Sequence, residues 1–199
     1  MEEKIVYFEE WGPKNTEETL SLAIERAKAR GIKKIVLAST RGETAKLAAQ
    51  RLTGTGIKMV IVPHQYGFIH KEQRFTPELV SEMAKQGHIV HFGTMLFHTD
   101  SLYGNSAPTI LANLLRTFCQ GMKVCVEIVM MAANAGLVAI GEQVVVVTGT
   151  GRGADTAIVA IAATSTHLAD LHITEIICKP LQTKQGPPPP PPPEEAKPK

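Results

Sequence analysis

The chain has 199 residues, of which 44% are hydrophobic, so it can bury one substantial core. Its 21 lysines and arginines nearly balance its 19 aspartates and glutamates, and it therefore lacks the basic field typical of nucleic-acid-binding proteins. The N-terminus is acidic and has no apolar run preceded by positive charge. We therefore expect no secretory signal and a cytoplasmic protein.

Short apolar runs alternate with amphipathic segments along the chain. Asn15 is a predicted N-cap, and the first helix should extend from there to Gly31 because apolar residues recur at helical spacing. The elements expected after it are, in order, strand 33–38, helix 44–52, strand 57–63, helix 77–87, strand 88–92, helices 107–119 and 122–135, strand 142–149, helix 154–169 and strand 173–180.

Residues 124–141 are apolar enough to resemble a membrane span. Glu127, Asn134 and two glycines interrupt the stretch, however, and Asn134 and Gly136 supply a helix stop. The stretch therefore predicts a buried central helix, and we expect no contact with a membrane.

Nearly continuous hydrophobic strands separated by helices indicate a parallel sheet covered on both faces. The expected fold class is α/β, with a mostly parallel five-stranded core sheet in a single domain, residues 1–183. If the strand order is 3-2-1-4-5, the first and fourth strands are neighbours. Residues 184–199 contain seven consecutive prolines, and we expect this proline-rich segment to be a disordered tail outside the fold.

Two loops follow strands at the predicted ligand edge of this sheet. The first contains Ser39, Thr40, Arg41, Gly42 and Thr44, and its hydroxyls and arginine are groups that bind phosphate. A helix N-terminus behind it would add free N–H groups and a positive dipole end. Because ligands of doubly wound sheets bind outside the carboxyl ends of the strands, this loop is expected to face an anionic ligand.

The second loop is glycine-rich and follows the fourth predicted strand. Gly149, Gly151 and Gly153 allow a sharp turn, Arg152 adds a cation, and a helix from Ala154 was expected to offer its N-terminus. The spacing also fits a G-x-G-x-x-A dinucleotide fingerprint, but no acidic residue ends the following strand, so the dinucleotide interpretation is weak.

Other residue types suggest less chemistry. The segment His64–Phe68 follows the second strand, where Tyr66 or Phe68 could lie against a planar ring and Gly67 could let the backbone approach it; an ordinary surface loop is the alternative. Glu127 is an acid in an apolar helix, so it needs a partner, and hydrogen bonds from loop N–H groups are favoured over proton transfer.

Neither the seven histidines nor the three cysteines form a metal-ligand pattern, so we expect no metal site. Cys119, Cys125 and Cys178 are unevenly spaced and are expected to be buried, inert thiols without a disulfide. No motif for nucleophilic catalysis is present.

The stretches IVLASTRGETA and EQVVVVTGTGRGADTA resemble the C-terminal α/β domain of pyruvate kinase, in which corresponding loops bind a phosphorylated effector. NTEETL, QGMKVCVEI, MAANAGL and EIICKP extend the likeness over most of residues 1–183, and the closer match is to standalone prokaryotic proteins of this kind. The resemblance implies a three-layer Rossmann-like sandwich that holds flavin mononucleotide (FMN).

Departures from pyruvate kinase narrow this expectation. No segment corresponds to the barrel that carries its catalytic lysine and metal sites, so we expect no kinase activity. Glu43 stands where the effector loop often has arginine, which favours a ligand with one phosphate over a sugar bisphosphate.

The expected function is binding of a phosphorylated small molecule, with FMN as the first candidate, by a binding or regulatory module that reports the ligand to a partner. The expected partner is a second copy of the chain in a homo-oligomer, or another protein. An FMN-dependent oxidoreductase of unknown substrate is the alternative. The candidate cofactor-binding residues are Ser39, Thr40, Arg41, Gly42, Glu43, Thr44, His64, Gly67, Phe68, Glu127, Gly149, Thr150, Gly151, Arg152, Gly153, Ala154 and Asp155.

Overall fold

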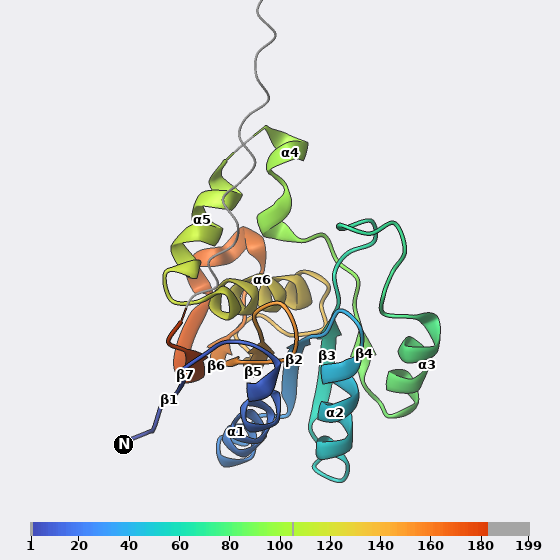
Figure 1. Ribbon diagram of the computed structural model, residues 1–199, viewed down its shortest axis with the longest axis vertical. Coiled ribbons are helices and arrows are strands. Elements are labelled where there is room, and N and C mark those ends of the chain that lie inside the picture. The colour runs from blue at the N-terminus through green and yellow to red at the C-terminus, as the bar shows by residue number, and fades with distance from the viewer. Residues whose placement is uncertain (1, 105, 183–199) are drawn as a thin grey trace, which may run out of the picture.

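A seven-stranded sheet organises the computed structural model, which describes residues 2–104 and 106–182 (Figure 1). The strands are β1 (Val6–Phe8), β2 (Lys34–Ala38), β3 (Lys58–Val62), β4 (Ile89–Val90), β5 (Gln143–Thr148), β6 (Thr156–Ile161) and β7 (His172–Pro180). The α-helices are α1 (Thr16–Ala29), α2 (Glu43–Leu52), α3 (Pro77–Lys85), α4 (Asp100–Tyr103), α5 (Ala107–Arg116) and α6 (Gln120–Asn134). Short 3-10 helices occur at Pro13–Asn15 (η1), Leu96–His98 (η2) and Ser165–Asp170 (η3).

The strand order is β1-β7-β6-β5-β2-β3-β4. Four neighbouring pairs are parallel, and only β6 runs antiparallel to the strands on either side of it. The predicted pairing of the first and fourth sequence-derived strands is confirmed, because β2 and β5 are parallel neighbours with Val36 opposite Val146.

Alternate residues of the central strands face two separate hydrophobic layers. Ile35, Leu37 and Val145 pack with α1 and α2 on one face, whereas Val36 and Val146 pack with α6 on the other. Figure 1 shows α6 lying across one face of the sheet while α1 and α2 cover the opposite face. The α/β class and the three-layer arrangement are therefore confirmed.

The predicted helix at 154–169 is wrong. Residues 156–161 form β6, a central strand, and a 3-10 helix follows at Ser165–Asp170. Ala157, Ile158, Val159 and Ala160 are all fully buried, so the strand shows no polar face and its alanines imitate a helix. β6 and the edge strand β1 together enlarge the sheet from the five strands expected.

Other boundaries differ in detail. The strand expected at 88–92 shortens to Ile89–Val90. Asn15 is the N-cap residue of α1, as predicted, but its amide donates to the carbonyl oxygen of Glu10 at 2.7 Å rather than capping the helix. The tail predicted at 184–199 lies outside the described residues.

Helix α6 lies unusually close to the sheet at its N-terminal end. A Cβ atom placed on Gly121 would lie 2.0 Å from Thr156 Oγ1 and 2.4 Å from Thr156 Cβ. The backbone carbonyl of Gly121 also accepts a hydrogen bond from Thr148 Oγ1 at 2.7 Å. The absence of a side chain at Gly121 therefore sets the distance between α6 and the sheet.

We expect Gly121→Ala to destabilise the protein. Alanine improves helix propensity by about 1 kcal/mol, but forcing a methyl group against a central strand costs about 1 to 3 kcal/mol, and at these distances the overlap should dominate. The free energy of unfolding from urea denaturation measures the net effect.

A double variant provides the control. If contact with Thr156 is the cause, Gly121→Ala should cost less in a Thr156→Gly background, because the two closest atoms are then gone and only Thr148 Oγ1, at 3.1 Å, remains near. Equal costs in the two backgrounds would contradict this explanation.

Candidate functional site

A cleft of about 920 Å³ opens at the carboxyl ends of the central parallel strands. Ala38 at the end of β2 and Val62 at the end of β3 form part of its floor, and Gly149 follows β5 directly. The opposite wall comes from α5, α6 and η2. This is the edge at which open α/β sheets bind ligands, as the sequence predicted.

The loop between β2 and α2 supplies one end of the cleft, and Ser39, Thr40, Arg41, Glu43 and Thr44 all line it. The side-chain oxygen of Ser39 accepts from the Ala45 N–H at 3.2 Å. The preceding N–H groups at the start of α2 have no acceptor within the helix, because the first turn of a helix leaves its N–H groups unpaired.

Gly42 has a different role from the one predicted. It is the N-cap of α2, with φ of 87°, and it does not line the cleft. A Cβ atom on Gly42 would approach Leu79 Cδ1 to 2.7 Å, so glycine is needed for the turn and for packing against α3.

The glycine-rich loop connects two antiparallel strands, so the helix N-terminus predicted at Ala154 does not exist. Two of its glycines are needed by the protein itself. A Cβ atom on Gly153 would lie 2.3 Å from Thr16 Oγ1, and one on Gly149 would lie 2.4 Å from the carbonyl oxygen of Gly153. The loop therefore folds tightly over the start of α1.

Three predicted site residues of this loop do not line the cleft. Thr150, Ala154 and Asp155 are each buried. The Ala154 N–H donates to Thr16 Oγ1 at 2.9 Å, which ties the loop to α1. Gly149, Gly151, Arg152 and Gly153 do line the cleft, as predicted.

Asp155 is the buried acceptor that organises this region. Its Oδ2 atom accepts from the Gly12 N–H at 3.0 Å and from the Thr150 N–H at 3.1 Å, and its Oδ1 atom accepts from Thr156 Oγ1 at 2.8 Å. Asp155 is fully buried. It holds the loop in shape and does not line the cleft.

The segment after β3 brings aromatic rings to the middle of the cleft. His64 and Phe68 line it, with ring centroids 4.9 Å apart, whereas Gly67 does not and Tyr66 is exposed beside Phe92. Burial, followed by the charge of Arg74, lowers the pKa of His64 and favours its neutral form. Its Nδ1 atom is buried and has no hydrogen-bond partner among the described residues.

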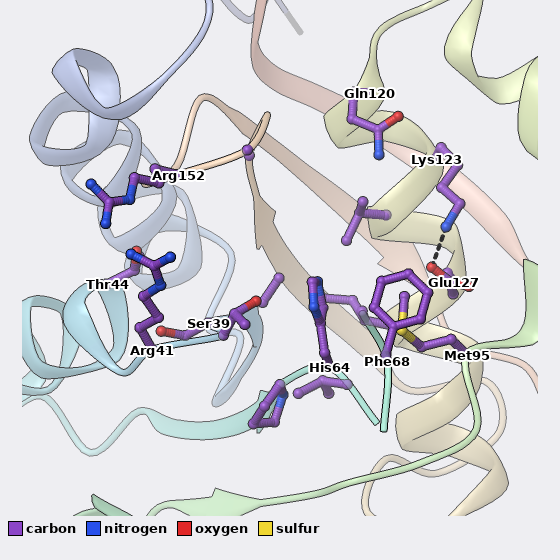
Figure 2. A pocket seen from close by; sticks show the side chains of 18 of the residues that line it. Ser39, Arg41, Thr44, His64, Phe68, Met95, Gln120, Lys123, Glu127 and Arg152 are labelled. Carbon is purple, nitrogen blue, oxygen red and sulfur yellow. Dashed lines mark hydrogen bonds and ion pairs between the residues drawn. The ribbon is translucent and has the colours of Figure 1, made fainter. Parts of the chain in front are cut away.

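A buried ion pair lines the α6 wall. Lys123 and Glu127 are each 1% exposed, and the Lys123 ammonium donates to Glu127 Oε2 at 2.5 Å (Figure 2). The Phe97 N–H donates to Glu127 Oε1 at 2.8 Å, so the loop N–H partner predicted for Glu127 is confirmed. Lys123 was missed, although its i, i+4 spacing from Glu127 in an apolar helix was a usable signal.

His98 completes this cluster from η2. Its Nε2 atom lies 3.0 Å from Lys123 Nζ, and because an ammonium only donates, His98 accepts there in its neutral form. Burial, and then the neighbouring Lys123 charge, lowers the pKa of His98. Burial also lowers the pKa of Lys123, while Glu127 opposes that shift.

Arginines inside and outside the cleft differ in their partners. Arg26, Arg30 and Arg51 lie elsewhere, and each forms an ion pair with a glutamate. The other four arginines line the cleft, and no carboxylate of the described residues pairs with any of them; they are Arg41, Arg74, Arg116 and Arg152. Sequence reasoning missed Arg74 and Arg116 because only the fold brings them to the cleft.

Within the described residues, no group of three or more histidine, cysteine or acidic side chains is placed to hold a metal ion. All three cysteines are buried and unpaired. Burial raises the pKa of the Cys125 thiol and raises that of Cys178 to about 12, so these two resist ionisation. No helix in the described ranges is both long and apolar enough to cross a membrane.

These features define an α/β domain with a basic cleft at the carboxyl edge of its sheet. A family model described as pyruvate kinase, alpha/beta domain, matches residues 17–162. The chain therefore belongs to the pyruvate kinase α/β domain family.

A solved pyruvate kinase from Cryptosporidium parvum is similar to this chain at 15% identity with a TM-score of 0.42. The match covers 74% of this chain but 23% of the Cryptosporidium chain, so the present sequence spans less than a quarter of that enzyme's length.

The role of Asp155 can be tested with two substitutions. Asp155→Ala leaves the Gly12 and Thr150 N–H groups without their acceptor, and at about 1 to 3 kcal/mol for each unsatisfied group we expect a loss of about 2 to 6 kcal/mol. Chemical denaturation measures the loss. Asp155→Asn is the matched control, because a rotated amide can still accept both N–H groups and donate to Thr156; equal losses in the two variants would contradict this role.

Proposed function

We propose that the chain binds a phosphorylated small molecule in this cleft, that FMN is this ligand, and that the chain acts as a binding or regulatory module without pyruvate kinase activity. The observation that carries the proposal is the set of four cleft arginines for which residues 2–104 and 106–182 supply no carboxylate partner. Unneutralised guanidinium groups around one cavity favour an anionic ligand, and their planar geometry suits phosphate.

The phosphate is assigned to the end of the cleft at the start of α2. In Figure 2, Arg41 and Arg152 lie on the same side of the cleft as Ser39 and Thr44. This end combines hydroxyl groups, two cations and the N–H groups of a helix start, which are the donors that phosphate monoesters prefer. Membership of the pyruvate kinase α/β domain family also supports a ligand-binding role.

A flat ring fits the opposite part of the cleft. Phe68, Met95 and Ile128 contribute apolar surface there, and the buried Nδ1 atom of His64 has no hydrogen-bond partner in the part of the chain that the structure describes. The isoalloxazine ring of FMN is apolar on its faces and polar along one edge, so it matches this combination. The chain's contribution would be to bind and orient the ring and to limit its contact with water.

An FMN-dependent oxidoreductase is the second candidate function. The Lys123, Glu127 and His98 cluster favours it, because buried charge beside a flavin changes the flavin's reactivity, and bound FMN would supply hydride or electron transfer. Steady oxidation of NADH or NADPH by the FMN-loaded protein would favour the enzyme over the binding module.

The phosphate assignment predicts that FMN binds much more tightly than riboflavin. Removing charge-assisted hydrogen bonds of about 1.5 to 3 kcal/mol each should weaken binding by about one or more powers of ten. We expect the same loss for FMN in Arg41→Gln, whereas riboflavin should bind this variant and the wild type alike. Quenching of flavin fluorescence measures all four affinities.

Arg51→Gln is the matched control, because Arg51 lies outside the cleft and pairs with Glu17. Arg41→Gln is preferable to Gly42→Val, which would also overlap Leu79. Equal affinities of the wild type for FMN and riboflavin would show that the phosphate assignment is wrong.

A further inference from the structure

The basic groups of the cleft lie on two separate sides. Arg41 and Arg152 belong to the α2 end, while Gln120 and Lys123 project from α6 on the other side, as Figure 2 shows. Arg116 belongs with the second group, since its Nε atom donates to Gln120 Oε1 at 2.8 Å. A single phosphate at the start of α2 would leave this second group without an anion.

Arg116 is held in place without being neutralised. Its Nη1 atom donates to Asn113 Oδ1 at 2.7 Å, so both of its hydrogen-bond partners in the described residues are neutral amides. The two amides fix the plane of the guanidinium, while the remaining N–H groups stay available. A preoriented guanidinium of this kind is suited to bidentate binding of a carboxylate.

Lys123 adds a donor to the same wall. An ammonium carries three hydrogens, and one donates to Glu127 Oε2 and one to His98 Nε2. The third has no hydrogen-bond acceptor among the described residues; Lys123 lines the cleft, and its Nζ atom lies 5.4 Å from the centroid of the Phe97 ring. Burying Lys123 and Glu127 within an apolar helix carries a desolvation penalty. Apolar side chains would pack in the same place without that penalty.

The local charge balance leaves one positive charge in excess. Glu127 neutralises Lys123, and nothing of opposite sign pairs with Arg116 in the part of the chain that the structure describes. Asp100, another acid whose charge acts on His98, accepts hydrogen bonds from Thr109 instead. The wall therefore attracts an anion in surroundings that weaken competition from water.

We propose that Arg116 and Lys123 form a second anion subsite on the α5–α6 wall, and that this subsite binds the carboxylate of a small molecule beside the phosphorylated ligand. His98, Glu127, Gln120 and Asn113 are positioning residues for the two cations. The cleft volume of about 920 Å³ is near the upper end of ordinary small-molecule sites, which leaves room for two occupants. The subsite goes beyond the proposed function and does not require the first ligand to be FMN.

Malonate is a suitable probe, because it presents carboxylates without an aromatic ring or phosphate. We expect isothermal titration calorimetry of the full chain to detect malonate binding that weakens at least about tenfold in Arg116→Gln, through loss of charge-assisted hydrogen bonds. Arg41→Gln and Arg51→Gln should leave malonate affinity within about twofold of the wild type. Arg116→Lys, which keeps the charge but loses the planar fork, should give an intermediate affinity.

Competition separates the two subsites. Saturating inorganic phosphate should leave the malonate affinity within about threefold of its value without phosphate. The reason is that phosphate is expected at the α2 end of the cleft and malonate at the α5–α6 wall. Displacement of malonate by phosphate, an unchanged affinity in Arg116→Gln with native circular dichroism, or absence of malonate binding to the wild type would each overturn the proposal. Malonate binding that depends on Arg116 in a protein that does not bind FMN would uphold this subsite while contradicting FMN as the ligand.

Discussion

The buried carboxylate of Asp155 is the interaction on which the ligand edge of this domain depends. It accepts N–H groups from Gly12 and Thr150, which are 143 and 5 residues away in sequence, and thereby joins the N-terminal segment to the turn between β5 and β6. With the bond between Ala154 and Thr16, it holds the glycine-rich loop against α1. The position of Arg152 over the cleft follows from this anchoring.

Arginines inside the cleft differ from those outside it in whether a carboxylate pairs with them. Arginines on α2 and on or directly after α1 are neutralised by glutamates, whereas no carboxylate of the described residues pairs with those at the cleft. Lys123 and Glu127 are the exception, since they neutralise each other within an apolar helix. The free charge of the cleft is therefore held by arginine, the side chain whose charge is least altered by burial.

The sequence predicted those parts of the fold that depend on local patterns. The β2–α2 loop and the burial of α6 follow from apolar runs and helix stops. β6 could not be recognised, because a central strand covered on both faces has no alternation, and its alanines suit a helix equally well. Arg74 and Arg116 were missed for another reason: no local signal shows that distant segments of the chain converge, whereas Lys123 and Glu127 were detectable by spacing.

The pairing of β1 with β7 has a consequence for how the chain folds during synthesis. Val6 lies opposite Cys178, so β1 cannot pair until β7, the last of the described strands in the chain, has been synthesised. Contacts of such long sequence separation slow folding and leave strand edges exposed meanwhile. The β2–β3 unit, whose strands are separated by α2 alone, can form long before the sheet is complete.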